Sequence, residues 1–170
     1  GFIYEREHTR LIGYVLASEE IVTLPDFTKQ IFHRTFENTH VKEVICNEGL
    51  EYVCYDGFSY AYDLENVQFK DGVEFDNLPA GIFHLSKLKS IRVPETTRRF
   101  PQMGVVDSLK DVYIGASVVH LWGNDGLMTK KLHECKNFST IKVSDANPYL
   151  TVRDNILYNT DCSELIQIAP

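Results

Sequence analysis

The sequence lacks long apolar runs and a surplus of basic residues, and each absence excludes a class of protein. Its purely apolar runs are only a few residues long, whereas a membrane-spanning helix needs roughly 20. The formal net charge is −7, but proteins that bind nucleic acid cluster Lys and Arg against the phosphates. We therefore expect neither a transmembrane segment nor a nucleic-acid partner. No basic segment with an apolar stretch behind it is visible near Gly1, so no leader can be recognised in this chain.

The cysteines also lack the spacings that mark metal or redox sites. None of the four forms a C-x-x-C pair, and no set of Cys and His has zinc-ligand spacing. Cys46 and Cys135 lie at or beside apolar strand positions, which favours packed hydrophobes, and a disulfide between any two cysteines stays open. Asp71, Glu74 and Asp76 are acidic, but no calcium loop of the D-x-D-x-D-G type is present. We expect no metal and no cofactor.

What the sequence does contain is an internal repeat. A phrase with three apolar positions, the last two separated by one residue, recurs five times, and its central residues follow one another after 23, 24, 21 and 29 residues. One short strand in every 20 to 30 residues is typical of a leucine-rich repeat solenoid, in which stacked units share one core. The five phrases are Val41–Cys46, Leu64–Phe69, Leu88–Pro94, Leu109–Ile114 and Phe138–Val143.

A second set of apolar pairs, five residues apart, lies between the strand phrases. Such pairs suit a segment that runs back along the far side of each unit and places an aromatic residue in the core. We expect this segment to form short helical or 3₁₀ turns. The pairs are Ile31 with Phe36, Val53 with Phe58, Leu78 with Phe83, and Phe100 with Val105.

These strand phrases and apolar pairs together resemble the sequence pattern of the BspA-like leucine-rich repeat family. Leu88–Pro94 is similar to its L-x-x-I-x-I-P strand, and Ile31–Phe36 is similar to its I-x-x-x-A-F segment. From Ile141 to Pro170 the chain resembles the family's closing hairpin, with Asn155 where glycine is usual. Asn tolerates the left-handed turn as well.

The resemblance implies a single β-rich α/β domain over residues 1–170, a right-handed, curved solenoid of about five to six units. Short parallel strands line its concave face, with helical turns and loops on the convex face. A hairpin-like unit covers residues 1–25, repeats cover 26–146, and a second hairpin-like unit covers 147–170. Because family members often continue into further repeats, the chain is also compatible with a segment of a longer protein.

Such solenoids bind mostly through outward strand residues, so the central outward row is the first candidate site. This row mixes apolar, aromatic and cationic residues, as protein-binding surfaces often do. A solvated face without a ligand is the alternative. The row is Ile45, Gln68, Arg92, Tyr113 and Lys142; flanking rows are Glu43, Asn66, Ser90, Asp111 and Thr140, then Asn47, Lys70, Pro94, Gly115 and Ser144.

Three further groups are weaker candidates. Tyr52, Tyr55, Tyr60 and Tyr62, with Phe58, could stack on a sugar or serve the core. The insertion at residues 120–127 offers a loop site at Trp122, Asn124 and Asp125, although Trp122 fits a core position too. His133, Glu134 and Cys135 place a thiol near a base, but no third group or oxyanion element can be named. Asn137 begins a glycosylation sequon, which matters only in a eukaryotic secretory pathway.

The sequence therefore favours a non-catalytic interaction or adhesion module of a secreted or surface-anchored bacterial protein. A protein, such as a host or matrix protein, or a glycan is the expected partner. The alternatives are a carbohydrate-binding or enzyme-accessory domain that uses the 120–127 loop, and a purely structural spacer.

Overall fold

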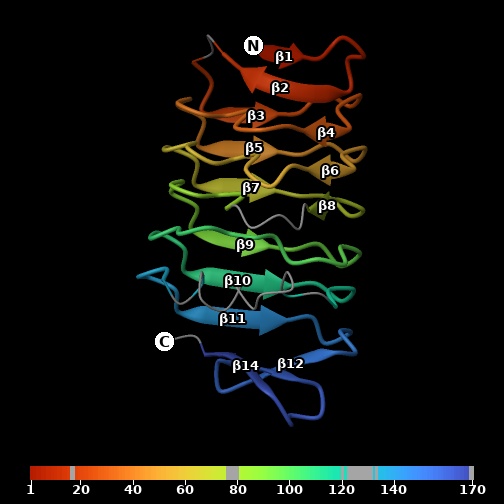
Figure 1. The fold of residues 1–170 in the computed structure, drawn as a ribbon, viewed down its shortest axis with the longest axis vertical. Coiled ribbons are helices and arrows are strands. Elements are labelled where there is room, and N and C mark those ends of the chain that lie inside the picture. The colour runs from red at the N-terminus through yellow and green to blue at the C-terminus, as the bar shows by residue number, and fades with distance from the viewer. Residues whose placement is uncertain (16–17, 76–80, 120, 122–131, 133, 169–170) are drawn as a thin grey trace.

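The computed structural model describes residues 1–15, 18–75, 81–119, 121, 132 and 134–168. Its short strands stack into a column with the N-terminus at one end and the C-terminal hairpin near the other (Figure 1). The strands are β1 (Phe2–Tyr4), β2 (Arg10–Tyr14), β3 (Ile21–Thr23), β4 (Gln30–Ile31), β5 (Glu43–Ile45), β6 (Tyr52–Val53), β7 (Asn66–Gln68), β8 (Glu74–Phe75), β9 (Ser90–Arg92), β10 (Asp111–Ile114), β11 (Thr140–Val143), β12 (Leu150–Arg153), β13 (Ile156–Asn159) and β14 (Leu165–Ile168).

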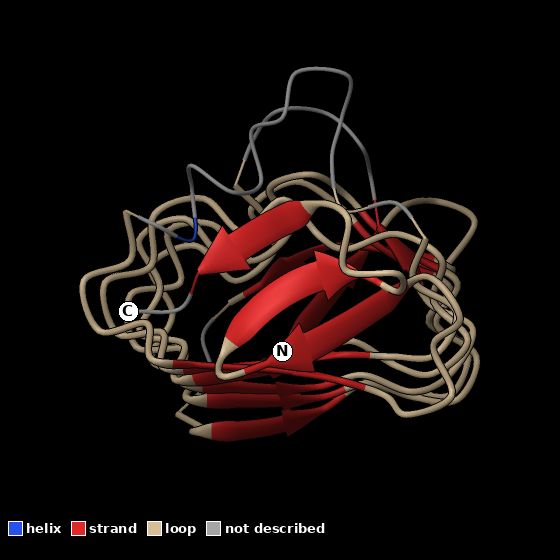
Figure 2. Ribbon diagram, turned by 90° about the horizontal axis from the view of Figure 1, so that it is seen from below, coloured by secondary structure: helices blue, strands red, loops and turns tan. Residues whose placement is uncertain are grey.

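Six of these strands form one side of the column, which we call the strand face (Figure 2). They are the parallel sets β3-β5-β7 and β9-β10-β11. A backbone hydrogen bond from Lys89 N to Glu65 O, 3.1 Å long, joins the two sets. The central residue of each predicted phrase points inward, because side chains alternate along a strand. Val44, Val67, Ile91, Val112 and Ile141 are all buried, which confirms the predicted register.

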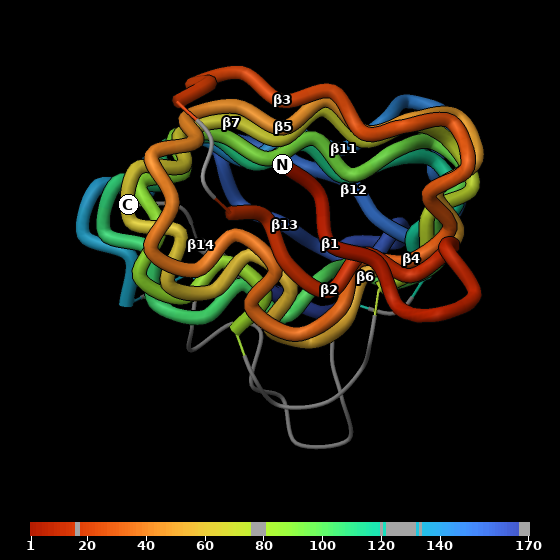
Figure 3. Tube along the Cα trace, turned by 90° about the horizontal axis from the view of Figure 1, so that it is seen from above, coloured from red at the N-terminus to blue at the C-terminus, as the bar shows by residue number. Residues whose placement is uncertain are grey.

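A second sheet lies on the opposite side of the core. It has the order β1-β2-β4-β6-β8, and β2, β4, β6 and β8 are parallel. Leu11, Ile31, Val53 and Phe75 pair in register across it and are buried. Seen from the N-terminal end, the chain runs clockwise from β3 to β4 and recedes to β5, so the coils are right-handed (Figure 3).

The helical turns predicted for the far side are wrong. Residues 33–38, 55–60 and 82–85 form turns, and Leu132 is the sole helical residue in the described ranges. The reason is that these turns bond between coils: Thr35 N donates to Gly57 O and Tyr60 N donates to His84 O, at 3.2 and 2.9 Å. A helix needs the same N–H groups for its own i−4 carbonyls, so stacking replaces helix formation. Arg34, Asn38, Tyr60 and Leu85 have positive φ, which also interrupts a right-handed helix.

The aromatic residues of the second set build a column through the core. Phe36, Phe58 and Phe83 are fully buried, and their rings stack at centroid distances of 5.5 and 5.4 Å with nearly parallel planes. Tyr14 continues this column at one end, with its ring 5.7 Å from Phe36. One predicted pair needs correction, because Val106 is fully buried whereas Val105 is only partly buried. Leu78 lies outside the described residues.

Buried asparagines close the turns that follow two strands of the strand face. Asn147 Nδ2 donates to Gly115 O and Val118 O, and its Oδ1 accepts from Tyr149 N and Leu150 N, at 2.9–3.0 Å. Asn47 Nδ2 similarly donates to the carbonyls of the preceding coil. The outward placement predicted for Asn47, Pro94 and Gly115 is therefore wrong. All three are buried, because the chain turns inward immediately after each strand.

Antiparallel hairpins lie at both ends of the column. β1 pairs with β2 at the N-terminal end, whereas β12, β13 and β14 form a three-stranded meander at the other. Asp154 and Asn155 occupy the β12–β13 turn with φ of 51° and 63°, so asparagine does take the left-handed conformation expected of it. Cys46 and Cys135 are buried as predicted. Within the described residues, no helix has the length and apolarity needed to cross a membrane.

Candidate interaction surface

The structure brings the central outward row together on the strand face. Tyr113 pairs with Arg92 on one side and Lys142 on the other, and Ile45 pairs with Gln68 in the other half. Gln68, Arg92 and Lys142 are exposed, while Ile45 and Tyr113 are partly covered. The residues singled out from the sequence thus form two adjoining groups on one surface.

The half built by β9, β10 and β11 carries a fixed polar cluster. The Arg92 guanidinium lies over the Tyr113 ring, 3.7 Å from its centroid. Glu95, in the turn after β9, accepts hydrogen bonds at Oε1 from Arg92 Nη2 and Tyr113 Oη, at 2.9 and 2.8 Å. Its Oε2 accepts from Ala116 N at 2.8 Å. These contacts hold a long cationic side chain in one position, which reduces the conformational entropy that a partner must remove on binding.

The cluster shifts the acidity of Glu95. Partial burial raises the pKa of this carboxyl group, but bonds from Tyr113, Ala116 and Ser144 and the charge of Arg92 outweigh burial, so the pKa lies below its ordinary value. Each donor stabilises the carboxylate over the neutral acid. Glu95 is therefore an anion at neutral pH and keeps Arg92 on the Tyr113 ring.

Two adjoining hollows follow this half of the strand face. A small one of about 190 Å³ lies over β9, β10 and β11, and a larger one of about 620 Å³ continues to the C-terminal hairpin. Tyr113 and Lys142 line both, so the two hollows form one groove with an aromatic ring and a cation at its centre. The smaller hollow is lined by Ser90, Ile91, Arg92, Asp111, Val112, Tyr113, Thr140 and Lys142.

A column of charged side chains precedes the strands on the same face. Lys42 forms an ion pair with Glu20 of the preceding coil at 2.6 Å, and two coils later Lys89 forms the equivalent ion pair with Glu65. The bond and charge of Glu20 raise the pKa of Lys42. Lys142, in contrast, forms no ion pair within the part of the chain that the structure describes. Its charge is thus available to a partner.

The repeats are those of a known family. The sequence pattern described as the BspA type leucine rich repeat region matches residues 16–121 in six copies. The chain belongs to the BspA-type leucine-rich repeat family. Repeats of this family commonly mediate protein interactions, and the solenoid fold is typically non-enzymatic.

Solved structures of bacterial proteins, among them leucine-rich repeat proteins, share the fold. A leucine-rich repeat protein from Eubacterium ventriosum has a TM-score of 0.63 at 18% identity over 83% of this chain, and one from T. pallidum has 0.64 at 16% over 83%. The pneumococcal vaccine antigen PcpA has 0.60 at 11% over 98%. The chain spans 36%, 67% and 55% of these proteins. No curated protein sequence matches it.

The tyrosine group and the loop residues, which the sequence also suggested as sites, do not form one surface in the described part of the BspA-type fold. Phe58 belongs to the core, Tyr60 lies under Arg34 at 4.6 Å, and Tyr62 is 46% exposed. The tyrosines therefore divide between several environments. The described residues do not include Trp122, Asn124 or Asp125, and Leu121 is the only residue of the predicted 120–127 loop among them. Asp76 and His133 also lie outside the described residues.

Sequence reasoning missed the residue that completes the Arg92–Tyr113 cluster and a second cluster elsewhere on the BspA-type coils. One is Glu95, whose role depends on the turn after Pro94. The other is His33, Cys54 and Asp56, whose ligand atoms lie within 4.8 Å of one another. The signal for this second group was available: Ile31 and Val53 are equivalent, so residues about 22 apart meet on adjacent coils.

Proposed function

We propose that this chain is a non-catalytic interaction module of a secreted or cell-surface bacterial protein. Its partner, a host or matrix protein, binds the strand face along the groove of β9, β10 and β11. The observation that carries this proposal is the Arg92–Tyr113–Glu95 cluster beside the open Lys142. Arg and Tyr supply much of the binding energy of protein interfaces when they are held in well-packed positions.

Membership of the BspA-type family supports this assignment, because these repeats commonly mediate protein interactions. The charge and the aromatic ring of the groove also favour one kind of partner. Two cations flank an aromatic ring, and the nearby carboxylate of Glu95 is already paired. An acidic or aromatic segment of a partner protein complements such a surface better than a basic one.

The test is binding of the purified chain to immobilised extracellular-matrix proteins and to a glycan array. Arg92→Ala and Tyr113→Ala should each weaken binding to the retained matrix protein at least about fivefold, as expected for interface residues worth more than about 1 kcal/mol. Lys136→Ala is the matched control, since it removes one exposed cation, paired with Asp107, from the turn before β11. Unchanged circular dichroism spectra would show that each variant folds.

Two results would overturn the proposal. If Arg92→Ala and Tyr113→Ala bind like the parent chain while Trp122→Ala abolishes binding, the 120–127 loop is the site, as a carbohydrate-binding or enzyme-accessory domain requires. If neither the matrix proteins nor the glycans are retained, the spacer alternative is favoured. Antibody labelling of intact bacterial cells tests the surface location separately.

A further inference from the structure

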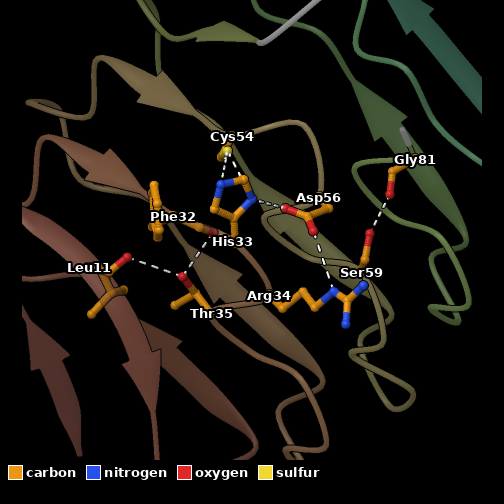
Figure 4. Close-up of polar contacts among 9 residues, drawn as sticks. All are labelled: Leu11, Phe32, His33, Arg34, Thr35, Cys54, Asp56, Ser59 and Gly81. Carbon is orange, nitrogen blue, oxygen red and sulfur yellow. Dashed lines mark hydrogen bonds and ion pairs between the residues drawn. The ribbon is translucent and has the colours of Figure 1, made fainter. Parts of the chain in front are cut away.

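His33, Cys54 and Asp56 form a compact cluster on two adjacent coils, away from the strand face. His33 lies in the turn after β4, and the other two follow β6 one coil later. Figure 4 shows the sulfur of Cys54 beside the His33 ring and the Asp56 carboxylate on the ring's other flank. From this geometry we infer that the cluster is a binding site for a zinc-type transition-metal ion.

The three donors are those that zinc prefers. Zn²⁺ binds thiolate sulfur, imidazole nitrogen and carboxylate oxygen, and a three-residue set leaves a fourth position for water or another donor. Hard cations such as Ca²⁺ and Mg²⁺ prefer oxygen donors alone. Within the described residues this is the only group of three such side chains whose ligand atoms converge.

The distances are close to those of a bound ion. Cys54 Sγ lies 3.4 Å from Nδ1 and 3.6 Å from Nε2 of His33. With ordinary zinc bond lengths and tetrahedral angles, a sulfur and a nitrogen ligand are roughly 3.5 Å apart. The sulfur–nitrogen distance therefore fits, but the sulfur is nearly equidistant from both ring nitrogens and so lies over the ring. Rotation of the Cys54 and His33 side chains must bring the sulfur and one nitrogen lone pair onto the same ion.

Asp56 needs a small adjustment. Its Oδ1 lies 2.7 Å from His33 Nδ1, a hydrogen-bond distance, whereas two ligands of one zinc ion lie roughly 3.3 Å apart. The ion takes the place of the proton between these atoms. The imidazole proton moves to Nε2, which can reach water because the His33 side chain is 34% exposed. The thiol proton leaves to solvent, so each ion bound releases one proton.

Backbone bonds hold the cluster in place on both sides. Cys54 N donates to Ile31 O at 3.0 Å, and Arg34 N donates to Asp56 O at 3.2 Å. The Asp56 side chain is 13% exposed and also contacts Arg34 Nε through Oδ2, at 3.4 Å. Arg34 is held against the Tyr60 ring, so its charge opposes the ion from a fixed position without blocking Oδ1.

The repeat itself does not require these residues. Phe32 precedes Cys54 by one coil at the same register position, and it is 36% exposed. That position is thus not part of the continuous core. A bound ion would connect the coils of β4 and β6 by three metal bonds in place of the contacts that His33 makes with Asp56 and Cys54.

The experiment uses the purified full chain, freed of metal with EDTA and then titrated. Isothermal titration with Zn²⁺ should show one ion bound per chain, with a heat that changes with buffer ionisation because a proton is released. Co²⁺ should give a near-ultraviolet thiolate-to-cobalt charge-transfer band. Cys54→Ser should remove this band, and His33→Gln and Asp56→Asn should each weaken Zn²⁺ affinity at least about tenfold.

Matched controls are available within the chain. His40→Gln removes the imidazole of the similar pair His40–Asp63, whose Nδ1–Oδ2 distance is 3.1 Å; Cys162→Ser removes a free thiol elsewhere. Both should bind Zn²⁺ and Co²⁺ like the parent chain. His33→Gln, at a partly exposed position, keeps the test valid if Cys54→Ser fails to fold.

Three outcomes would overturn the inference. They are the absence of Zn²⁺ binding, a charge-transfer band that survives Cys54→Ser, and a band lost in Cys162→Ser. Zn²⁺ should also raise the melting temperature of the parent chain and leave that of His33→Gln unchanged. A rise of equal size in both would place the ion elsewhere.

Discussion

Truncation of Phe58 tests whether the aromatic column holds the coils together. Phe58 is fully buried and lies between Phe36 and Phe83, with nearly parallel rings at 5.5 and 5.4 Å. A Phe→Ala change in a core costs about 3–5 kcal/mol. Aromatic pairs contribute about 0.5–1.5 kcal/mol beyond their buried area, and this change removes two. We therefore expect Phe58→Ala to lower the free energy of unfolding by about 5 kcal/mol.

The assay is urea unfolding followed by circular dichroism and by intrinsic fluorescence. Coincident transitions establish that one free energy describes the whole chain. Because a solenoid is stabilised mainly between neighbouring coils, the substitution also tests cooperativity. A smaller denaturant slope in Phe58→Ala would show that the coils on its two sides unfold separately.

Two further variants make the result specific. Phe58→Leu keeps most of the side-chain volume but removes both ring pairs, so it should cost about 1–3 kcal/mol, less than Phe58→Ala. Tyr62→Ala removes an aromatic residue that is 46% exposed, so it should change stability by about 0.5 kcal/mol or less. A loss below about 2 kcal/mol in Phe58→Ala would refute the view that the stacked rings are a main support of the core.

Two other substitutions test the polar contacts. Glu95→Gln should lower the free energy of unfolding at neutral pH by at most about 1 kcal/mol, since the site is partly exposed. Because folding lowers the pKa of Glu95, its contribution is present above the unfolded pKa and is lost as pH falls through the folded pKa. Urea curves of both chains should therefore converge in acid, and a difference that grows in acid would contradict this sign. Asn147→Ala removes four hydrogen bonds in a buried turn and should cost about 3 kcal/mol in thermal unfolding; Asn137→Ala, which removes one exposed bond to Asp107 O, should cost far less.

The strands of the strand face could be predicted because their signal is local. Two apolar residues separated by one polar residue must share a face of a strand, so Val44 and its equivalents identify the inward side before any coil is stacked. The period then places Tyr113 between Arg92 and Lys142. The sequence therefore predicts the composition of the surface, although only a binding measurement can establish its use.

The turns could not be predicted because their conformation depends on a neighbouring coil. Thr35 and Tyr60 donate their N–H groups to residues more than 20 positions away, and no local propensity describes such a bond. The same limit applies to the Glu95 cluster, whereas the equivalence of Ile31 and Val53 could have indicated the His33–Cys54 pair. Glu95 reaches Tyr113 from the previous coil, and His33 meets Cys54 only when two coils are in register.

The charged column before the strands has a consequence for how such a chain can lengthen. Glu20, Lys42, Glu65 and Lys89 follow one another at equivalent positions and alternate in sign. Duplication of a single coil within this series would place two like charges side by side, whereas duplication of two adjacent coils would preserve the alternation. Growth in steps of two is therefore electrostatically favoured here, and Lys110, which follows Lys89 at the next equivalent position, marks where that rule ends.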